Sequence, residues 1–417
     1  MKIQIISIGD EVLIGDIVNT NASFIAAELV KNQFNVTKIS VVGDAESEIL
    51  EEFSEALNKN DVVITTGGLG PTHDDITKKC IAKFFKSELR MNEEVLNDLK
   101  IFFDKRHRQL TKVNEMQALV PDVAKTIKNK NGTAPGLWIT RDNKILISLP
   151  GIPIEMQEMI TEEVIPQLIS VRGAVPKIRK TKHLLTTGLP ESYLYERLGN
   201  LDMILGGAHL AFLPNQYGVK MRITVEDADE TSASNKLIEI EQKIRSKVGR
   251  FIYGTEDTTL EEVIARLLKE RNLTISVAES CTGGLISDRI TNVSGSSKYF
   301  ERGVIAYSNS AKVEILKVSE DVIAEFGAVS ERVAKEMAQG IRAISVTDIG
   351  LSTTGILGPT GATENKPVGL VFVGLCDDKN CFAKKFQFGD DRILNKARAS
   401  QAALDVLRRY LLGIPDE

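Results

Sequence analysis

The sequence predicts an α/β protein with two α/β domains and a smaller α+β module between them. Short apolar runs alternate with helical patterns up to about residue 170 and again after residue 258, which is typical of parallel sheets covered by helices. The 417 residues suffice for two or three domains, and 42% of them are apolar, enough to fill several cores. We expect domains over 1–170, 180–252 and 256–414.

The first domain is expected to be a parallel sheet whose loops converge on one site. Ligands bind beyond the carboxyl ends of such strands, and each predicted strand here is followed by a glycine-containing loop. These loops are GDE (9–11), GD (43–44), GGLGPTHDD (67–75) and PGIP (150–153). The expected strands are 3–8, 36–42, 62–66 and 145–149, and helical patterns cover 20–32, 45–58 and 75–86.

Residues 183–254 predict a strand, a helix, two strands and a long helix, which together make the small α+β module. From residue 258 the alternation of strands and helices resumes, and Thr258 and Glu261 are expected to form a T-x-x-E capping box at its first helix. The expected strands lie near 273–278, 302–307, 349–354, 368–375 and 380–388. The expected helices lie near 259–271, 284–292, 310–317, 330–344 and 391–411.

Composition excludes several classes of protein. A net charge of −5 and a pI near 5.7 argue against a dedicated nucleic-acid binder. No apolar stretch reaches the roughly 18 residues of a membrane span, and the N-terminus lacks the apolar core of a signal peptide. Cys80, Cys281, Cys376 and Cys381 form no CxxC pair, so we expect no structural zinc. We expect reduced thiols and a cytoplasmic location, because no export signal is present.

Acids and glycines gather at the predicted strand ends of the first domain. In TTGGLGPTHDD (65–75), glycine allows backbone amides to approach an anion closely, although a tight turn is the simpler interpretation. Neighbouring carboxylates repel one another unless they are solvated or neutralised by a cation, and oxygen ligands suit Mg²⁺. The sequence therefore predicts a phosphate and metal site, while the absence of GxGxxG after the first strand and of any GK dipeptide excludes the two familiar nucleotide loops. The acids are Asp10, Glu11, Asp44, Asp74 and Asp75.

Five segments of this domain resemble the molybdopterin-binding-type (MoaB/MogA-like) domain of CinA proteins. They are GDEVLIGDIVNTN (9–21), TTGGLGPTHDD (65–75), NEMQA (114–118), NGTAPG (131–136) and LPGIPIEM (149–156). The resemblance implies a metal-dependent ADP-ribose pyrophosphatase that releases AMP and ribose 5-phosphate, with Mg²⁺ or a similar ion at Asp44, Asp74 and Asp75. Relatives of this domain bind molybdopterin instead, so a molybdopterin-handling protein is an alternative. The implied site comprises Asp10, Glu11, Asn21, Gly67, Gly68, Gly70, Thr72 and Asp74.

The same family has a KH-type fold where the middle module lies. A KH module that binds nucleic acid needs a GxxG loop to clamp the backbone, and none occurs between residues 170 and 254. We therefore expect a spacer or dimerisation element, with RNA binding as the minor alternative.

The segment TISVAESCTGG (274–284) places Ser280 where an apolar run meets a helix start. A serine there commonly caps the helix, whereas a nucleophilic serine needs a base. No histidine follows His209, which leaves lysine or tyrosine for that role, and Ser-Lys pairs are a known solution. Lys312, in RGVIAYSNSAK (302–312), is the candidate base, although a solvated lysine and a core tyrosine at Tyr307 are the simpler interpretation.

Three further features belong to this second site. Cys281 is a rival nucleophile whose pKa a helix terminus would lower, but it lacks a nearby histidine. The loop TTGILGPTGATENKPVG (353–369) offers amides for an oxyanion or a ribose phosphate, unless it is only a long surface loop. Arg392 suits a phosphate, with Arg398 as a second candidate.

This half resembles the nicotinamide-nucleotide amidohydrolase (PncC) domain of the same family through VAESCTGG, RGVIAYSNSAK, GILGPTG…KPVG and GDDR. The resemblance implies metal-free deamidation of nicotinamide mononucleotide (NMN) to nicotinate mononucleotide and ammonia in a homodimer. Ser280 would attack the carboxamide, and Lys312 with Tyr307 would move the protons. Leu357 and Thr360 depart from the usual AGPGG-like loop. A sensor that binds NMN or ADP-ribose without turnover is the alternative. The implied substrate contacts are Thr282, Gly283, Gly284, Asn309, Gly358, Pro359, Thr360, Gly361 and Arg392.

Overall fold

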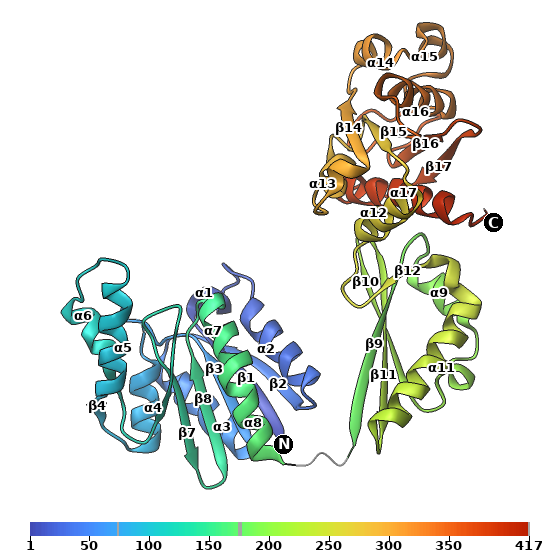
Figure 1. Ribbon diagram of the computed structural model, residues 1–417. Coiled ribbons are helices and arrows are strands. Elements are labelled where there is room, and N and C mark those ends of the chain that lie inside the picture. The colour runs from blue at the N-terminus through green and yellow to red at the C-terminus, as the bar shows by residue number, and fades with distance from the viewer. Residues whose placement is uncertain (73–74, 174–176, 416–417) are drawn as a thin grey trace. The chain divides into compact units, whose positions relative to one another are not determined.

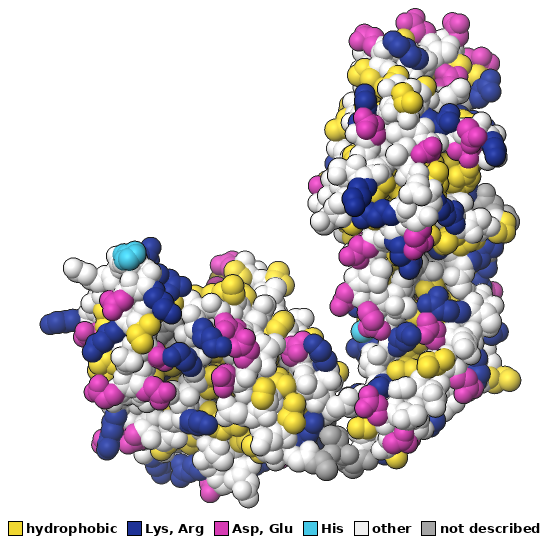
Figure 2. Space-filling model, in the orientation of Figure 1, with side chains coloured by type: hydrophobic (Ala, Val, Ile, Leu, Met, Phe, Trp, Pro, Cys, Tyr) yellow, Lys and Arg dark blue, Asp and Glu magenta, His cyan; other side chains and the backbone are white. Residues whose placement is uncertain are grey.

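The computed structural model describes residues 1–72, 75–173 and 177–415. The chain divides into two compact units, Met1–Pro176 and Lys177–Glu417, each of which is described by itself (Figure 1). On the face seen in Figure 2, basic and acidic side chains are mixed over the surface of each unit. Among the described residues, no helix combines the length and the apolar character that a membrane crossing requires.

The first unit is built on a six-stranded sheet in the order β2-β1-β3-β8-β7-β6. The first four of these strands run parallel, and β7 and β6 are antiparallel additions at one edge. The prediction of four parallel strands is confirmed. Strands β1, β3 and β8 are buried as predicted, whereas the edge strand β2 has no buried residue, so the prediction of burial is wrong there. The strands are β1 (Lys2–Ile8), β2 (Asn35–Val42), β3 (Val62–Thr66), β6 (Lys125–Ile127), β7 (Gly136–Arg141) and β8 (Lys144–Leu149), and β4 (Leu89–Met91) pairs with β5 (Leu119–Pro121) separately.

Helices cover both faces of this sheet, which explains why its inner strands β1, β3 and β8 are buried almost throughout rather than at alternate residues. Ile5 packs with α2 and α7 on one face, and its neighbour Ile6 packs with α3 and α4 on the other, because successive side chains of a strand point to opposite faces. The helices are α1 (Asp10–Leu13), α2 (Thr20–Lys31), α3 (Glu46–Lys59), α4 (Thr77–Phe85), α5 (Glu93–Asp104), α6 (Lys112–Glu115), α7 (Pro153–Met159) and α8 (Ile165–Arg172).

The middle module opens the second unit with a four-stranded antiparallel sheet in the order β10-β11-β9-β12. One face packs on the long helix α11 through a core that includes Met221, Ile223 and Ile244. The predicted order of strand, helix, two strands and long helix is confirmed, and α10 and β12 are additional. The elements are β9 (Ile178–Thr186), α9 (Glu191–Leu198), α10 (Leu201–Leu205), β10 (His209–Asn215), β11 (Gly218–Asp227), α11 (Glu230–Val248) and β12 (Ile252–Thr255).

The rest of the second unit is a five-stranded sheet in the order β14-β13-β15-β16-β17. Strand β13 is parallel to β14 and β15, whereas β16 and β17 are antiparallel. Helices α12, α13 and α17 cover one face, and α14, α15 and α16 cover the other. The strands are β13 (Ile275–Glu279), β14 (Phe300–Ile305), β15 (Ile349–Gly355), β16 (Leu370–Cys376) and β17 (Cys381–Gln387). The helices are α12 (Leu260–Arg271), α13 (Leu285–Thr291), α14 (Asn309–Leu316), α15 (Glu320–Phe326), α16 (Glu331–Ser345) and α17 (Arg392–Leu412).

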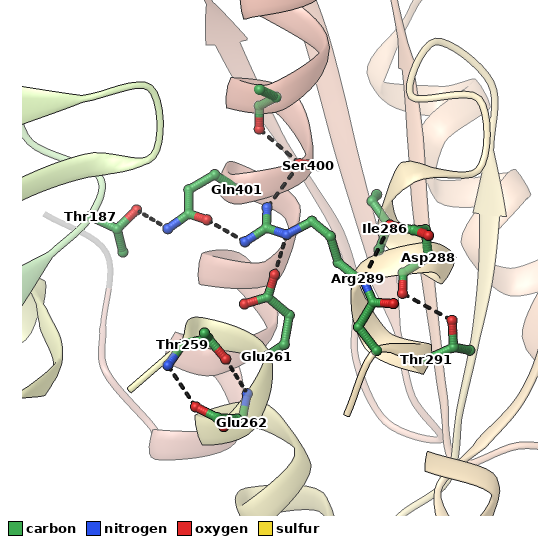
Figure 3. Close-up of polar contacts among 12 residues, drawn as sticks. Thr187, Thr259, Glu261, Glu262, Ile286, Asp288, Arg289, Thr291, Ser400 and Gln401 are labelled. Carbon is green, nitrogen blue, oxygen red and sulfur yellow. Dashed lines mark hydrogen bonds and ion pairs between the residues drawn. The ribbon is translucent and has the colours of Figure 1, made fainter. Parts of the chain in front are cut away.

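Two details of the helices in this domain correct the expectations from sequence. The capping box lies one residue later than predicted, at Thr259 and Glu262, because TTLEE contains two overlapping T-x-x-E patterns (Figure 3). The short helix α15 was not predicted. Its N-cap, Ser319, accepts a hydrogen bond from the Val322 amide.

The expectation of reduced thiols is wrong for one pair of cysteines. Cys376 and Cys381 form a disulfide across the β16–β17 hairpin. They are directly opposed in the antiparallel ladder, with their Cα atoms 4.1 Å apart. Cys80 and Cys281 are free and buried.

Candidate active site

Ser280 lies at the carboxyl end of β13, an interior strand of the five-stranded sheet. Its amide donates to the Thr353 carbonyl at the end of the neighbouring parallel strand β15 (3.0 Å). Its side chain is largely buried, with 8% of the residue exposed. Ser280 therefore lies at the strand end where ligands of open α/β sheets bind.

Lys312 is the partner of Ser280. It lies in the first turns of α14, where only 2% of the residue is exposed, and its Nζ lies 3.1 Å from Ser280 Oγ. The same nitrogen donates to the carbonyls of Ala306 (2.9 Å) and Tyr307 (3.1 Å). These two carbonyls follow β14, so the sheet itself fixes the amine against the serine. The simpler interpretation of Lys312 as a solvated lysine is wrong.

Burial lowers the pKa of the Lys312 ammonium below its ordinary value of 10.5, because the charged form loses its hydration. The nearby Cys281 has a smaller, opposite effect on this pKa. An amine that loses its proton more easily can accept one from a neighbouring hydroxyl. The pair has the geometry of a serine nucleophile and its base.

Cys281 points into the core instead. It belongs to the apolar cluster on one face of the sheet, and burial raises the pKa of its thiol to about 12, an effect that a hydrogen bond with Thr353 partly opposes. The thiolate is the reactive form of cysteine, so this environment makes Cys281 a poor nucleophile.

Helix α13 is capped by a residue that the sequence analysis missed. The buried carboxylate of Glu279 accepts hydrogen bonds from the amides of Gly284 (3.0 Å), Ile286 (3.1 Å) and Ser287 (2.8 Å), and from the Ser287 hydroxyl (2.7 Å). The prediction placed the possible cap on Ser280, but the N-cap position is Gly284, and Glu279 satisfies the free amides. Ser280 is therefore not the N-cap of α13.

The turn after Ser280 holds two backbone amides suited to an oxyanion. Within the described chain, the amides of Cys281 and Thr282 donate to no other residue, whereas the next amide, that of Gly283, donates to the Ser280 carbonyl (3.2 Å). The Thr282 hydroxyl is 2.7 Å from that of Thr353, which ties the turn to β15. Oxyanion holes commonly use the amide directly after the nucleophile.

Tyr307 and Arg392 form a second polar group at the rim. Arg392 begins α17 and donates to the Tyr307 hydroxyl (3.0 Å) and to the Gly358 carbonyl (2.8 Å). Tyr307 is 61% exposed, so the interpretation of it as a core residue is wrong. Its carbonyl, and not its hydroxyl, contacts Lys312.

A second basic residue of α17 was also missed. Lys396 lies four residues after Arg392, and its Nζ lies so near Gly283 that a Cβ added there would be 3.4 Å away. No ion pair or hydrogen bond of its ammonium is present among the described residues. Arg398, the predicted second candidate, points toward Gly389 instead.

The loop after β15 is held by Asn395. This buried side chain donates to the carbonyls of Leu357 (3.0 Å) and Gly389 (2.7 Å). Leu357 is buried, so its departure from the family pattern fills the core, whereas Thr360 is exposed at the tip. Of the predicted contacts, Pro359, Gly361 and Asn309 are also exposed, and Gly358 is buried.

Comparison with known proteins agrees with this architecture. Three family models match in succession: a molybdopterin binding domain over 4–170, a damage-inducible protein CinA KH domain over 181–254 and a CinA C-terminal domain over 257–411. A CinA-like protein of Kosmotoga olearia is 44% identical over 414 residues, which cover 99% of this chain and 100% of that protein. A CinA-like protein of Salinibacter ruber is 44% identical over 413 residues, with 99% and 100% covered. The chain belongs to the CinA family.

A solved structure of this family has also been matched. The competence/damage inducible protein CihA of Agrobacterium tumefaciens is 36% identical, and the match covers 36% of this chain and 93% of that protein, with a TM-score of 0.34. The predicted resemblance to CinA proteins and the predicted fold class, with a molybdopterin-binding-type domain, a KH-type module and a CinA C-terminal domain, are confirmed.

The CinA-type N-terminal site is assembled where β1, β2, β3 and β8 end. Asp10 and Asp44 join the first two loops through two reciprocal hydrogen bonds. The Asp10 amide donates to Asp44 Oδ2 (3.0 Å), and the Asp44 amide donates to Asp10 Oδ1 (3.1 Å). Asn21 Nδ2 donates to Thr66 Oγ1 (3.2 Å) and to the Gly151 carbonyl (2.6 Å), which joins the last two loops. The predicted convergence of the loops is confirmed.

The glycine loop of this site is tightly packed. A side chain at Gly67 would meet the Ile8 carbonyl at 2.0 Å, and one at Gly68 would meet Thr77 Oγ1 at 2.1 Å. Both residues have positive φ values, 111° and 65°, so glycine is required on two grounds. A side chain at Gly70 would likewise meet the Asp75 carboxylate, at 2.3 Å. This carboxylate is engaged with the amide of Thr72 (2.9 Å) and with its hydroxyl (2.5 Å).

The predicted metal ligands are only partly visible. Asp44 and Asp75 are described, whereas Asp74 lies outside the described residues. Over the described ranges, no three His, Cys, Asp or Glu side chains are grouped as a metal ion would require. Glu11 lies beside Asp10 in the first turn of α1. The metal ligands therefore stay a prediction.

Proposed function

We propose that the C-terminal domain is a nicotinamide-nucleotide amidohydrolase that converts NMN and water to nicotinate mononucleotide and ammonia. The observation that carries the proposal is the contact of 3.1 Å between the buried Lys312 Nζ and Ser280 Oγ. The same domain contains no histidine, so lysine is the base that this serine has. The resemblance to nicotinamide-nucleotide amidohydrolases supports the choice of substrate.

In the first step, Ser280 Oγ bonds to the carboxamide carbon, and its proton passes to the neutral Lys312 amine. The carbonyl oxygen becomes an oxyanion that the amides of Cys281 and Thr282 stabilise. The carbon–nitrogen bond then breaks, and the ammonium of Lys312 returns the proton to the leaving ammonia. Tyr307 assists this transfer in the proposed scheme.

In the second step, water hydrolyses the ester that links Ser280 to the nicotinoyl group. Lys312 takes a proton from this water, and the acyl carbon–Oγ bond breaks to release nicotinate mononucleotide and restore the serine. Both steps are complete with groups of the protein and water, so no metal enters the scheme. The ribose phosphate lies against Arg392 and Lys396, whose cations are four residues apart on α17.

We propose a second activity for the N-terminal domain, the cleavage of ADP-ribose to AMP and ribose 5-phosphate. Asp44 and Asp75 each have one carboxylate oxygen, Oδ1, without a hydrogen bond among the described residues, and the Asn21 Oδ1 atom is buried without a partner. Such oxygen donors fit Mg²⁺ or a similar hard ion, which would polarise the diphosphate. Asp44 and Asp75, with Asp74, are the residues that would hold it.

Product analysis tests both activities in the full chain. NMN should yield ammonia and nicotinate mononucleotide in equal amounts with a chelator present, and ADP-ribose cleavage should require a divalent metal and be lost in Asp44→Asn. Binding of NMN or ADP-ribose without product would establish the sensor alternative and overturn the enzyme. Binding of molybdopterin in preference to ADP-ribose would overturn the second activity alone.

A further inference from the structure

Arg289, on α13, is a buried cation held by two other helices. Its Nε pairs with Glu261 on α12, and its two terminal nitrogens donate to Ser400 Oγ (2.9 Å) and Gln401 Oε1 (2.7 Å) on α17 (Figure 3). Only 8% of the residue is exposed. A guanidinium is planar and its donors are fixed in direction, so three partners define both its position and its tilt.

The middle module completes this arrangement from the other side. Gln401 Nε2 donates to the hydroxyl of Thr187, just beyond the end of β9 (3.1 Å). Tyr217, in the turn between β10 and β11, places its ring 4.8 Å from the Arg289 guanidinium carbon. A cation over an aromatic face is stabilised when both are removed from water. Two residues of the middle module therefore contact the cluster that holds Arg289.

The other end of α13 adjoins the turn that bears the proposed nucleophile, Ser280. Arg289 is in the last turn of this helix, and the amides of Gly284, Ile286 and Ser287 at its first turn bind the Glu279 carboxylate. Glu279 directly precedes Ser280. A helix this short moves as one body, so a displacement at Arg289 reaches the Ser280 turn.

We propose that the middle module is a positioning element of the amidohydrolase site. Thr187 and Tyr217 fix Arg289, Arg289 fixes α13, and α13 fixes the turn that presents Ser280 to Lys312. Arg289 is a positioning residue and touches no reacting atom. The expected change in kcat rests on the proposed function, whereas the expected effect on the position of α13 rests on the contacts alone.

Three substitutions in the middle module test this inference without touching the catalytic domain. Tyr217→Leu removes the aromatic face, Tyr217→Phe retains it, and Thr187→Val replaces the hydroxyl by a methyl group of similar size. Tyr193→Ala, at a 57% exposed position on α9 of the same module, is the matched control. Each variant is made in the full chain, and two quantities are measured: kcat and KM for NMN, and hydrogen exchange of the amides at 284–287.

We expect the double variant Tyr217→Leu/Thr187→Val to lose about tenfold in kcat with little change in KM, because it misplaces the nucleophile without altering substrate contacts. Its amides at 284–287 should exchange faster. Tyr217→Phe should match the wild type in both measurements, as should Tyr193→Ala. A mere loss of folding would lower the active fraction in proportion and would leave kcat per folded molecule unchanged.

Unchanged kcat and unchanged exchange in the double variant would overturn the inference. Slow kcat with unchanged exchange would also overturn it, because the effect would not then pass through α13. If the wild type releases no ammonia from NMN, the proposed function fails, and the exchange measurement alone decides whether the middle module positions α13.

Discussion

The Lys312 amine lies 3.1 Å from the Ser280 hydroxyl, and two backbone carbonyls hold it there. The carbonyls belong to Ala306 and Tyr307, just after β14, and Ser280 follows the adjacent strand β13. The two carbonyls at the end of β14 thus hold the lysine side chain in the rotamer that brings its amine to Ser280 on the adjacent strand. This rigidity is what a base needs in order to act on a single hydroxyl.

Lys312→Met should lower the rate of NMN deamidation by about 10²–10⁴-fold, because methionine fills the same space without a basic nitrogen. Lys312→Arg should be similarly inactive, since a guanidinium stays protonated. Burial lowers the pKa of Lys312 from 10.5, so kcat/KM of the wild type should rise with pH through that lowered pKa as the amine becomes neutral. A pH profile that falls over this range, or an active Lys312→Met variant, would show that another group is the base.

Cys281→Ala should retain deamidase activity and lose about 1 kcal/mol of stability through a small cavity. Burial raises the pKa of this thiol to about 12, so it stays protonated near neutral pH. Iodoacetamide should therefore leave Cys281 unmodified in the folded protein at pH 8, as mass spectrometry can show. Rapid alkylation there with loss of activity would reverse the ranking of the two nucleophiles.

Glu279→Gln should lower the free energy of unfolding by about 1–3 kcal/mol. The NH₂ group of the glutamine would face backbone N–H groups at the start of α13, and two donors cannot form a hydrogen bond with each other. Ser287→Ala removes only the hydroxyl that Glu279 accepts and should cost less, about 0.5–1.5 kcal/mol. Urea unfolding followed by circular dichroism compares the two. Equal stability of Glu279→Gln and wild type would mean that the carboxylate is not the cap of α13.

Much of the fold was predictable because buried strands and amphipathic helices leave a direct pattern in the sequence. Val62–Thr66 is fully buried and entirely composed of β-branched residues, so its assignment was secure. The exact position of a motif is harder to predict when the sequence fits it in two overlapping registers. TTLEE fits a capping box in two registers, and packing of Leu260 in the core selects Thr259 and Glu262.

The candidate pair Ser280 and Lys312 could be proposed from residue type and elimination, and the structure places the two side chains in contact, but their surroundings could not be predicted. Glu279 sits in an apolar strand, and nothing local shows that its carboxylate turns toward α13. Lys396 and Arg289 acquire their neighbours from helices far away in sequence. The Cys376–Cys381 disulfide could have been predicted, since the two cysteines flank a four-residue polar turn between two predicted strands.

In the first unit, Lys78 should make stability depend on pH. Its ammonium donates to the carbonyl (3.0 Å) and side-chain oxygen (2.7 Å) of the buried Gln117. Burial lowers its pKa from 10.5 to about 8, an effect that Asp75 partly opposes. Between these two pH values the unfolded chain binds more protons than the folded one. The free energy of unfolding should therefore rise with pH across that window, by up to about 3 kcal/mol. Below the window, Lys78 is protonated in both states and should add no pH dependence.

Trp138 makes this measurable, because it is the single tryptophan of the chain and is buried in the first unit. Urea unfolding followed by its fluorescence at several pH values should give a flatter pH dependence for Lys78→Met than for wild type. Lys79→Met, at the exposed neighbouring position, is the control and should keep the wild-type slope. Identical slopes for all three proteins would mean that Lys78 keeps its ordinary pKa in the fold.

The most direct test of the central claim is ammonia release from NMN by the wild type and by Ser280→Ala, measured with EDTA present. Circular dichroism of both proteins serves as the control for folding, and ADP-ribose cleavage, measured with a divalent metal, shows that the first unit is unaffected. We predict metal-free release of ammonia by the wild type, none by Ser280→Ala, and equal ADP-ribose cleavage by the two. Ammonia release by Ser280→Ala at the wild-type rate would contradict the account, because the nucleophile would then lie elsewhere.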